Sequence, residues 1–206
     1  GWPSDDPLQA ALAASGFVHV EIPREHDWVR FAVPGMRLDF GGIGKGWAAD
    51  EAGEVLRKRG VSSFLIDFGG DLLAGDAPPD QPEGWRVRYA SVLTGADHGD
   101  LFSPAFAPED TGQEIYGFPV PLRNGAVATS GSSEQYVSID NVRYSHVLDP
   151  ATGLGSTDTL AATVIAVEAW LADAVATAAS AKSLDSEVRD KIETLGANVF
   201  AQTMLP

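Results

Sequence analysis

A stretch of four glycines and one lysine, DFGGIGKGWAAD at residues 39–50, lies between an apolar run and a run with helical spacing. A Walker phosphate loop needs Ser or Thr after its lysine, but Gly46 follows Lys45. A dinucleotide fingerprint fits residues 44–49 but needs a parallel βαβ unit, and the downstream pattern is antiparallel. Small residues before a helix still let a ligand approach free backbone N–H groups, which bind anions. The stretch predicts an anion-binding loop, with an ordinary glycine turn as the alternative.

A predicted helix over residues 168–183 carries two isolated polar side chains. From Ala169 to Ala179 every residue is apolar except Asp173 and Thr177. Their spacing places them on one face, one turn apart. A buried carboxylate needs a partner or a metal, and carboxylate and hydroxyl oxygens suit Mg²⁺ or Ca²⁺. The pattern predicts a metal site, or alternatively a hydrogen-bonded pair in which Asp173 meets a backbone N–H or an arginine.

A histidine precedes a tight turn in YSHVLDPATG at residues 144–153. His146 lies near the end of a strand predicted over 142–148, a common place for a general base. The alternative is a structural histidine. Two further glycine turns, in FLIDFGGDLLAGD at 64–76 and GAVATSGS at 125–132, are either binding loops or ordinary turns.

These segments, in this order and together with the VIA…LADAVAT run at 164–177, resemble the FAD:protein FMN transferases of the ApbE type. The resemblance runs from about residue 2 to the end of the chain. It implies an Mg²⁺-dependent transferase that cleaves the pyrophosphate of FAD. FMN would pass to a threonine or serine hydroxyl of a target flavoprotein as a phosphoester, with release of AMP.

The resemblance also implies roles for individual residues. Asp173 and Thr177 match side-chain ligands of Mg²⁺, and the loop at Gly42 matches a backbone ligand. His146 matches the base that deprotonates the target hydroxyl. Contacts with the flavin nucleotide are implied for four residues, which are Asp39, Gly42, Lys45 and Leu148.

Alternative functions use the same residues. One is a metal-dependent FAD pyrophosphatase that uses water in place of the hydroxyl, and another is a non-catalytic flavin-binding module. Members of the resembled family carry an N-terminal segment before the point that resembles Gly1 and Trp2, and we expect this chain to lack it. The first four residues resemble a cut edge. Family members work in the bacterial periplasm or cell envelope, often as lipoproteins, so we expect that location.

The elements that must position these residues are antiparallel strands with a few helices, which predicts an α+β, ApbE-like fold. We expect one domain over 1–206 with a flexible insertion at 94–114. A loop of that length is usually a lid, a binding loop or a disordered segment. Helices are predicted over 7–15, 47–59, 168–183 and 186–194. Strands are predicted over 17–22, 28–33, 63–67, 72–74, 85–91, 116–122, 125–129, 134–139, 142–148, 160–167 and 197–203.

The composition excludes several classes of function. The formal net charge of −15 disfavours nucleic acid as a partner. The absence of cysteine excludes thiol catalysis, disulfides and thiolate metal sites. No apolar run approaches the roughly 18 residues of a membrane span, so no transmembrane segment is expected.

Overall fold

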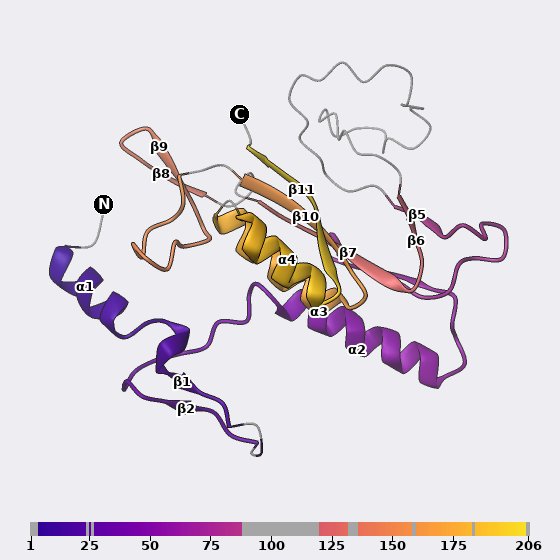
Figure 1. The fold of residues 1–206 in the computed structure, drawn as a ribbon, viewed down its shortest axis with the longest axis horizontal. Coiled ribbons are helices and arrows are strands. Elements are labelled where there is room, and N and C mark those ends of the chain that lie inside the picture. The colour runs from indigo at the N-terminus through magenta and orange to yellow at the C-terminus, as the bar shows by residue number, and fades with distance from the viewer. Residues whose placement is uncertain are drawn as a thin grey trace.

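The computed structural model describes residues 4–23, 25, 27–87, 120–131, 136–157, 160–182 and 184–204, and confirms the α+β class (Figure 1). The predicted insertion at 94–114 lies outside these residues. The helices in the described part are α1 (Asp5–Ala13), the 3₁₀ helix η1 (Phe17–His19), α2 (Gly44–Lys58), α3 (Ala169–Ala181) and α4 (Ser186–Thr194). The strands are β1 (Val20–Glu21), β2 (Arg30–Phe31), β3 (Leu65–Phe68), β4 (Asp71–Ala74), β5 (Trp85–Val87), β6 (Val120–Leu122), β7 (Gly125–Gly131), β8 (Tyr136–Ile139), β9 (Val142–Ser145), β10 (Leu160–Ala166) and β11 (Ala197–Met204).

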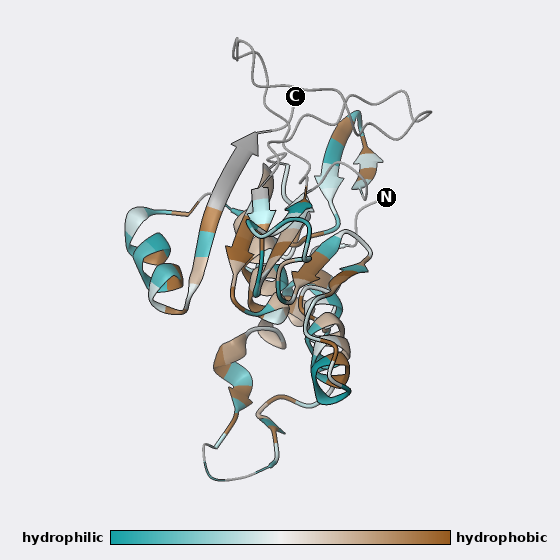
Figure 2. Ribbon diagram, turned by 90° about the vertical axis from the view of Figure 1, so that its right-hand side faces the viewer, coloured by the Kyte–Doolittle hydropathy of each residue, from teal (hydrophilic) through white to brown (hydrophobic). Residues whose placement is uncertain are grey.

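A five-stranded antiparallel sheet forms the centre, in the order β11-β10-β7-β4-β3. β10 pairs along its length with β7, from Ala161 opposite Gly131 to Ala166 opposite Ala126. Helix α3 packs on β7 and β10, α2 packs on β3 and β4, and α4 packs on β11. Hydrophobic residues concentrate on the central strands (Figure 2), so the main core lies between this sheet and α3.

Three short antiparallel pairs lie outside that sheet: β1–β2, β5–β6 and β8–β9. Figures 1 and 2 show the β1–β2 pair projecting from the body of the molecule. No helix among the described residues is long and apolar enough to span a membrane.

The predicted strand over 17–22 is largely wrong. Phe17–His19 forms a 3₁₀ helix, and only Val20 and Glu21 pair with a neighbouring strand. Alternating apolar residues predict a strand with one buried face, but Phe17 and Val18 remain 77% and 85% exposed. Without a core to cover, the alternation does not determine an extended backbone.

Two predicted boundaries near the candidate site also change. Helix α2 begins at Gly44, three residues before the predicted start at Trp47, because the amides of Ile43 and Gly44 already bond to the carbonyl of Phe40. Strand β9 ends at Ser145, so His146 follows the strand. The Ser145 amide donates to the carbonyl of Ser156 and the Val147 amide to the Ser145 hydroxyl, which turns the chain out of the β8–β9 ladder.

Candidate functional site

The centre of the candidate site is the contact between the first turns of α2 and α3. A Cβ atom added at Gly46 would lie 2.2 Å from the backbone oxygen of Ala169 and 2.7 Å from the Cα atom of Trp170. Real side chains do not approach backbone atoms this closely, so only glycine permits this contact. The glycine stretch therefore forms the loop before α2 and also lets the N-termini of two helices come together.

Each of these helices is capped by an aspartate of the other. The Gly46 amide in α2 donates to Oδ2 of Asp173 in α3 at 3.0 Å. The amides of Ala169 and Trp170 in α3 donate to the two carboxylate oxygens of Asp50 in α2, at 3.0 and 2.8 Å. Neither helix receives a side-chain cap from its own N-cap residue. The exchange satisfies first-turn N–H groups that would otherwise lack a partner.

Asp173, Thr177 and Gly42 meet at this contact, although they come from distant parts of the chain. Asp173 is buried, at 3% exposure, and Thr177 lies one turn further along α3. A Cβ atom added at Gly42 would lie 2.8 Å from Cγ2 and 3.2 Å from Oγ1 of Thr177, so the loop backbone touches this side chain. The three residues predicted to bind a metal therefore lie together in the structure.

The chemistry of these donors fits Mg²⁺. Oδ1 of Asp173, the Thr177 hydroxyl and backbone oxygen from the Gly42 loop are hard ligands, and Mg²⁺ is commonly held by one or two carboxylates plus substrate phosphates. Within the described ranges no group of three or more His, Cys, Asp or Glu side chains could hold a metal alone. Such an ion would therefore also need waters or oxygens from a bound ligand.

Two acidic residues of this region were missed as functional residues in the sequence. Asp71 is 2% exposed and forms an ion pair through Oδ2 with Nζ of Lys45, which also lies 3.5 Å from Oδ1 of Asp173. The other is the capping residue Asp50. The available signal for Asp71 was an acid at the start of a buried strand, after the Gly69-Gly70 turn. Asp50 gave no comparable signal, because its partners are 119 and 120 residues away.

The electrostatics of this cluster favour a charged lysine. Burial lowers the pKa of Lys45, but the hydrogen bond to Asp71 and the charges of Asp71 and Asp173 outweigh it, so the pKa is raised. Burial is also the main reason that the pKa of Asp71 is raised, and the charge of Asp173 adds to it, while the hydrogen bond from Lys45 opposes it. One ammonium group is thus shared by two crowded carboxylates and offsets only part of their negative charge.

Asp39 lies on the loop before α2 with an exposed side chain. Its Oδ1 accepts a hydrogen bond from the Gly41 amide at 2.7 Å, a local turn that shapes the start of the glycine loop. The structure thus gives Asp39 a role in loop shape, and its predicted contact with a nucleotide stays a prediction.

His146 and Leu148 lie on a separate part of the chain, after β9, and the structure does not place them in the cluster around Asp173. Both side chains are exposed, with Leu148 at 58%. The turn that follows them packs against α1, since a Cβ atom at Gly153 would lie 2.9 Å from Cδ2 of Leu12. The base and nucleotide roles implied for these two residues therefore stay predictions.

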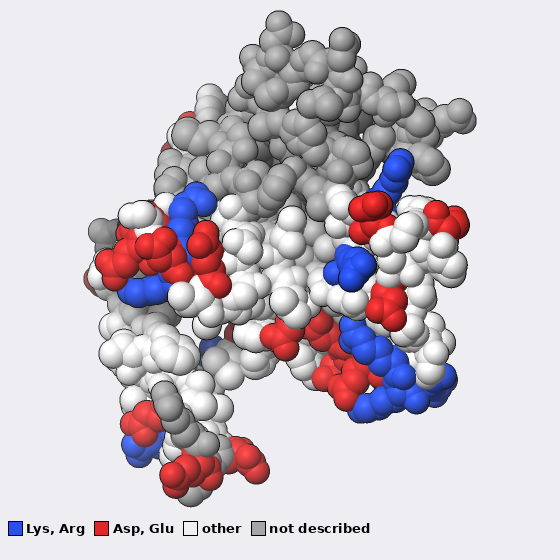
Figure 3. All heavy atoms as spheres, turned by 45° about the vertical axis from the view of Figure 1, so that its right-hand side comes forward, with Lys and Arg blue, Asp and Glu red and all other residues white. Residues whose placement is uncertain are grey.

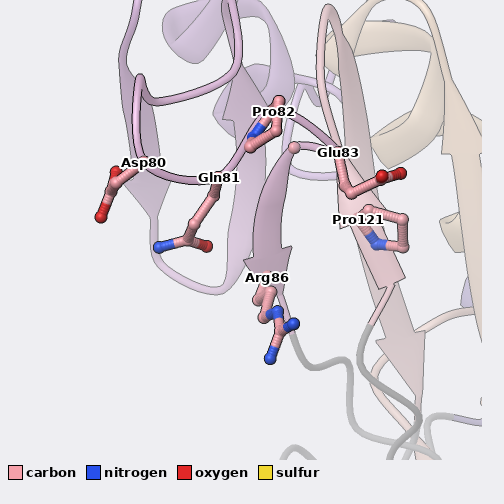
Figure 4. A pocket seen from close by; sticks show the side chains of 7 residues that line it. Asp80, Gln81, Pro82, Glu83, Arg86 and Pro121 are labelled. Carbon is pink, nitrogen blue, oxygen red and sulfur yellow. The ribbon is translucent and has the colours of Figure 1, made fainter.

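A cavity of about 460 Å³ lies elsewhere, at the β5–β6 pair. Its polar side chains do not converge: Arg86, Asp80 and Glu83 point in different directions (Figure 4). A ligand site normally gathers a few polar groups toward one point. We therefore place the candidate site at the α2–α3 contact. The lining comprises Asp80, Gln81, Pro82, Glu83, Gly84, Arg86 and Pro121.

On the face of the molecule shown in Figure 3, acidic and basic side chains lie next to one another in small groups, with one basic group at the lower right.

This chain is similar in sequence to known proteins of one family. The ApbE family model matches residues 1–196. FAD:protein FMN transferase of Treponema pallidum (strain Nichols) is 33% identical over 184 residues, 85% of this chain and 48% of that protein. FAD:protein FMN transferase of Vibrio cholerae serotype O1 is 29% identical over 155 residues, 73% of this chain and 39% of that protein. The chain thus spans about half the length, or less, of these relatives.

Solved structures give the same answer for the fold. The apo form of flavinyl transferase ApbE from Pseudomonas stutzeri superposes with a TM-score of 0.66 at 32% identity, over 86% of this chain and 49% of that one. The ApbE protein of Thermotoga maritima superposes with a TM-score of 0.67 at 28% identity, over 96% of this chain and 58% of that one. The family match covers nearly the whole sequence, and the chain belongs to the ApbE family.

Proposed function

We propose that this chain acts in Mg²⁺-dependent transfer of FMN from FAD to a threonine or serine hydroxyl of a target flavoprotein. The observation that carries the proposal is the meeting of Gly42, Thr177 and Asp173 at two helix N-termini, with Lys45 beside them. The Lys45 ammonium group favours phosphate, and the oxygen donors favour a divalent cation. The names of the relatives support the same reaction.

In this proposal Asp173, Thr177 and the Gly42 loop hold Mg²⁺, which when bound neutralises the pyrophosphate and the charge that develops on transfer. Lys45 supplies a second cation at the start of α2, and its raised pKa keeps it charged at neutral pH. Asp39 and Leu148 contact the flavin nucleotide. Gly46 lets the two helices approach closely enough to present these groups together.

The transfer step exchanges one P–O bond for another. The hydroxyl oxygen of the acceptor attacks the phosphorus atom of the FMN half, and a phosphoester bond forms there. The bond from that phosphorus to the bridging oxygen breaks, and AMP leaves with the oxygen. His146 takes the hydroxyl proton, since a threonine hydroxyl is too weak an acid to react without a base. His146 stands after β9 on an exposed loop, where an acceptor protein can reach it.

We further propose that the reaction takes place in the bacterial periplasm or cell envelope. The family resemblance suggests this compartment, and a chain without cysteine is compatible with oxidising conditions. The acceptor would then be an envelope flavoprotein with an accessible threonine or serine.

The test mixes the chain with FAD, Mg²⁺ and an acceptor flavoprotein, with EDTA as the control. We expect flavin fluorescence on the acceptor after denaturing electrophoresis, equimolar AMP by chromatography, and neither product with EDTA. His146→Ala should slow transfer by about 10²- to 10⁴-fold while Mg²⁺ binding persists. Release of AMP and free FMN without labelled acceptor would instead support an FAD pyrophosphatase. Absence of both FAD binding and AMP would contradict any catalytic role for this chain.

A further inference from the structure

Asp71 is a buried carboxylate to which the proposed reaction assigns no role. It begins β4 directly after the Gly69-Gly70 turn and is 2% exposed. Burying a carboxylate without a partner is costly, and a hydrophobic residue would suit the start of a buried strand better. The partner of Asp71 is Lys45, which comes from the first turn of α2.

Lys45 is shared between Asp71 and the proposed metal ligand. Its Nζ atom pairs with Oδ2 of Asp71 and lies 3.5 Å from Oδ1 of Asp173. The other oxygen of Asp173 is already occupied by the Gly46 amide at 3.0 Å. The ammonium group therefore faces the one oxygen of Asp173 that a metal would use.

The turn between β3 and β4 holds Asp71 in this place. Gly69 and Gly70 both have positive φ angles, 64° and 92°, as a tight two-residue hairpin requires. A Cβ atom at Gly69 would lie 3.7 Å from Cδ of Lys45, so the turn runs along the lysine stem. The position of Asp71 is thus set by the hairpin, and the position of the ammonium group is set by Asp71.

We infer that Asp71 is a positioning residue that holds the Lys45 ammonium group beside Asp173, where its charge weakens binding of a divalent cation to the ligand-free protein. This inference rests on the proposed function, because it assumes a metal at Asp173. With Lys45 the three side chains carry a net charge of about −1, and without its charge about −2. Lys45 thereby keeps the metal site weak until a phosphate ligand draws the ammonium group away.

The experiment measures Mg²⁺ affinity without nucleotide, by isothermal titration calorimetry, for the whole chain and four variants. Lys45→Gln removes the charge but keeps a hydrogen-bond donor for Asp71, and Asp71→Asn removes the anchoring charge. The double variant has about the same net charge in this cluster as the original. Asp67→Asn is the matched control, since Asp67 is exposed on the other side of the Gly-Gly turn and its Oδ1 accepts from the Gly70 amide.

We expect Lys45→Gln to bind Mg²⁺ about 5- to 20-fold more tightly than the original chain, but less than about threefold more tightly when it is made in the Asp71→Asn background, where the ammonium group is no longer held beside Asp173. Asp67→Asn should stay within about twofold. Because Lys45 is partly exposed, we expect Lys45→Gln to fold, and its Mg²⁺ affinity can be measured even if Asp71→Asn does not fold.

Unchanged affinity in Lys45→Gln would overturn the inference and leave the proposed function standing, with Asp71 and Lys45 as a purely structural pair. Absence of saturable Mg²⁺ binding, in the original chain and in Lys45→Gln alike, would overturn both the inference and the metal assignment. An equal effect of Lys45→Gln in the original chain and in the Asp71→Asn background would show that the two charges act independently, and would contradict a positioning role for Asp71.

Discussion

The α2–α3 contact and the N-terminal segment from Phe17 to Phe31 differ in how far their apolar and small residues are buried. At the contact, Gly46 lies against the backbone of Ala169, and buried Ala172 and Ala176 continue the close packing along α3. In the N-terminal segment large apolar side chains remain exposed, and its two short strands pair only with each other among the described residues. Apolar content alone therefore does not show where a core forms, because burial depends on a second surface that fits.

The largest effect should come from filling the close contact at Gly46. Gly46→Val would place a side chain inside the 2.2 Å separation from the Ala169 oxygen, so the helices must move apart and both caps are lost. We expect a loss of about 3 kcal/mol or more in the free energy of unfolding, measured by urea denaturation.

Gly44→Ala is the matched control for this variant. A Cβ atom at Gly44 would lie 4.0 Å from the Cβ atom of Phe40, which is ordinary contact, and its φ angle is not positive. The free energy of unfolding of this control should lie within about 0.5 kcal/mol of that of the original chain. Equal losses in both variants would show that general glycine loss, and not the helix contact, determines the effect.

Removing the cross-helix cap should have the next largest effect. Asp50→Ala leaves the Ala169 and Trp170 amides without their acceptor, and we expect a loss of about 1 to 2 kcal/mol by urea denaturation. Glu51→Ala, at the exposed neighbouring position, should change stability by less than about 0.5 kcal/mol. An unchanged free energy of unfolding in Asp50→Ala would mean that α3 does not depend on α2 for its cap.

A substitution in the N-terminal segment should change stability less than Gly46→Val or Asp50→Ala. Val18→Ser alters a side chain that is 85% exposed, so we expect less than about 0.5 kcal/mol in the same assay. Leu73→Ala in the core should cost about 2 to 5 kcal/mol and serves as the comparison. A loss above about 1 kcal/mol for Val18→Ser would show that this surface is covered in solution.

The smallest expected effect is the change with pH in the stability that Lys45 contributes at the α2–α3 contact. The pKa of Lys45 is raised on folding, so its contribution to stability is complete below the ordinary value of 10.5 and is lost as the pH rises through the folded value. Lys45→Gln should therefore lose less stability than the original chain between pH 9 and pH 11, by urea denaturation at each pH. Identical pH profiles would contradict the raised pKa.

The pKa of Asp71 is also raised, which gives a separate effect at acidic pH. The folded chain binds this proton more tightly than the unfolded chain, so the contribution of Asp71 falls as the pH rises from below 3.8 through the folded value. Asp71→Asn should lack that acidic change, whereas Asp67→Asn should keep it.

Much of the fold could be predicted from local patterns, because such patterns report on residues within one element. The helix around Asp173 and the hairpin across Asp140-Asn141 were predicted and are present. Asp140 and Asn141 both have positive φ angles, as such a turn requires. The predicted N-terminal strand failed because its alternation had no core to face. The end of β9 was misplaced because hydrogen bonds from the Ser145 amide to the Ser156 carbonyl and from the Val147 amide to the Ser145 hydroxyl compete with the ladder.

The sequence by itself determined the antiparallel α+β class, the acidic and cysteine-free composition, and the placement of Asp173 and Thr177 on one helical face, since helix periodicity fixes neighbours three and four residues apart. Only the tertiary structure decided that Gly42 touches Thr177, that Asp50 caps α3, and that Lys45 lies between Asp71 and Asp173. These contacts join residues 26 to 135 positions apart, and no local spacing encodes them. They arise because Gly46 allows two helix N-termini to meet. Backbone N–H groups without a helical partner and buried carboxylates then form hydrogen bonds with each other.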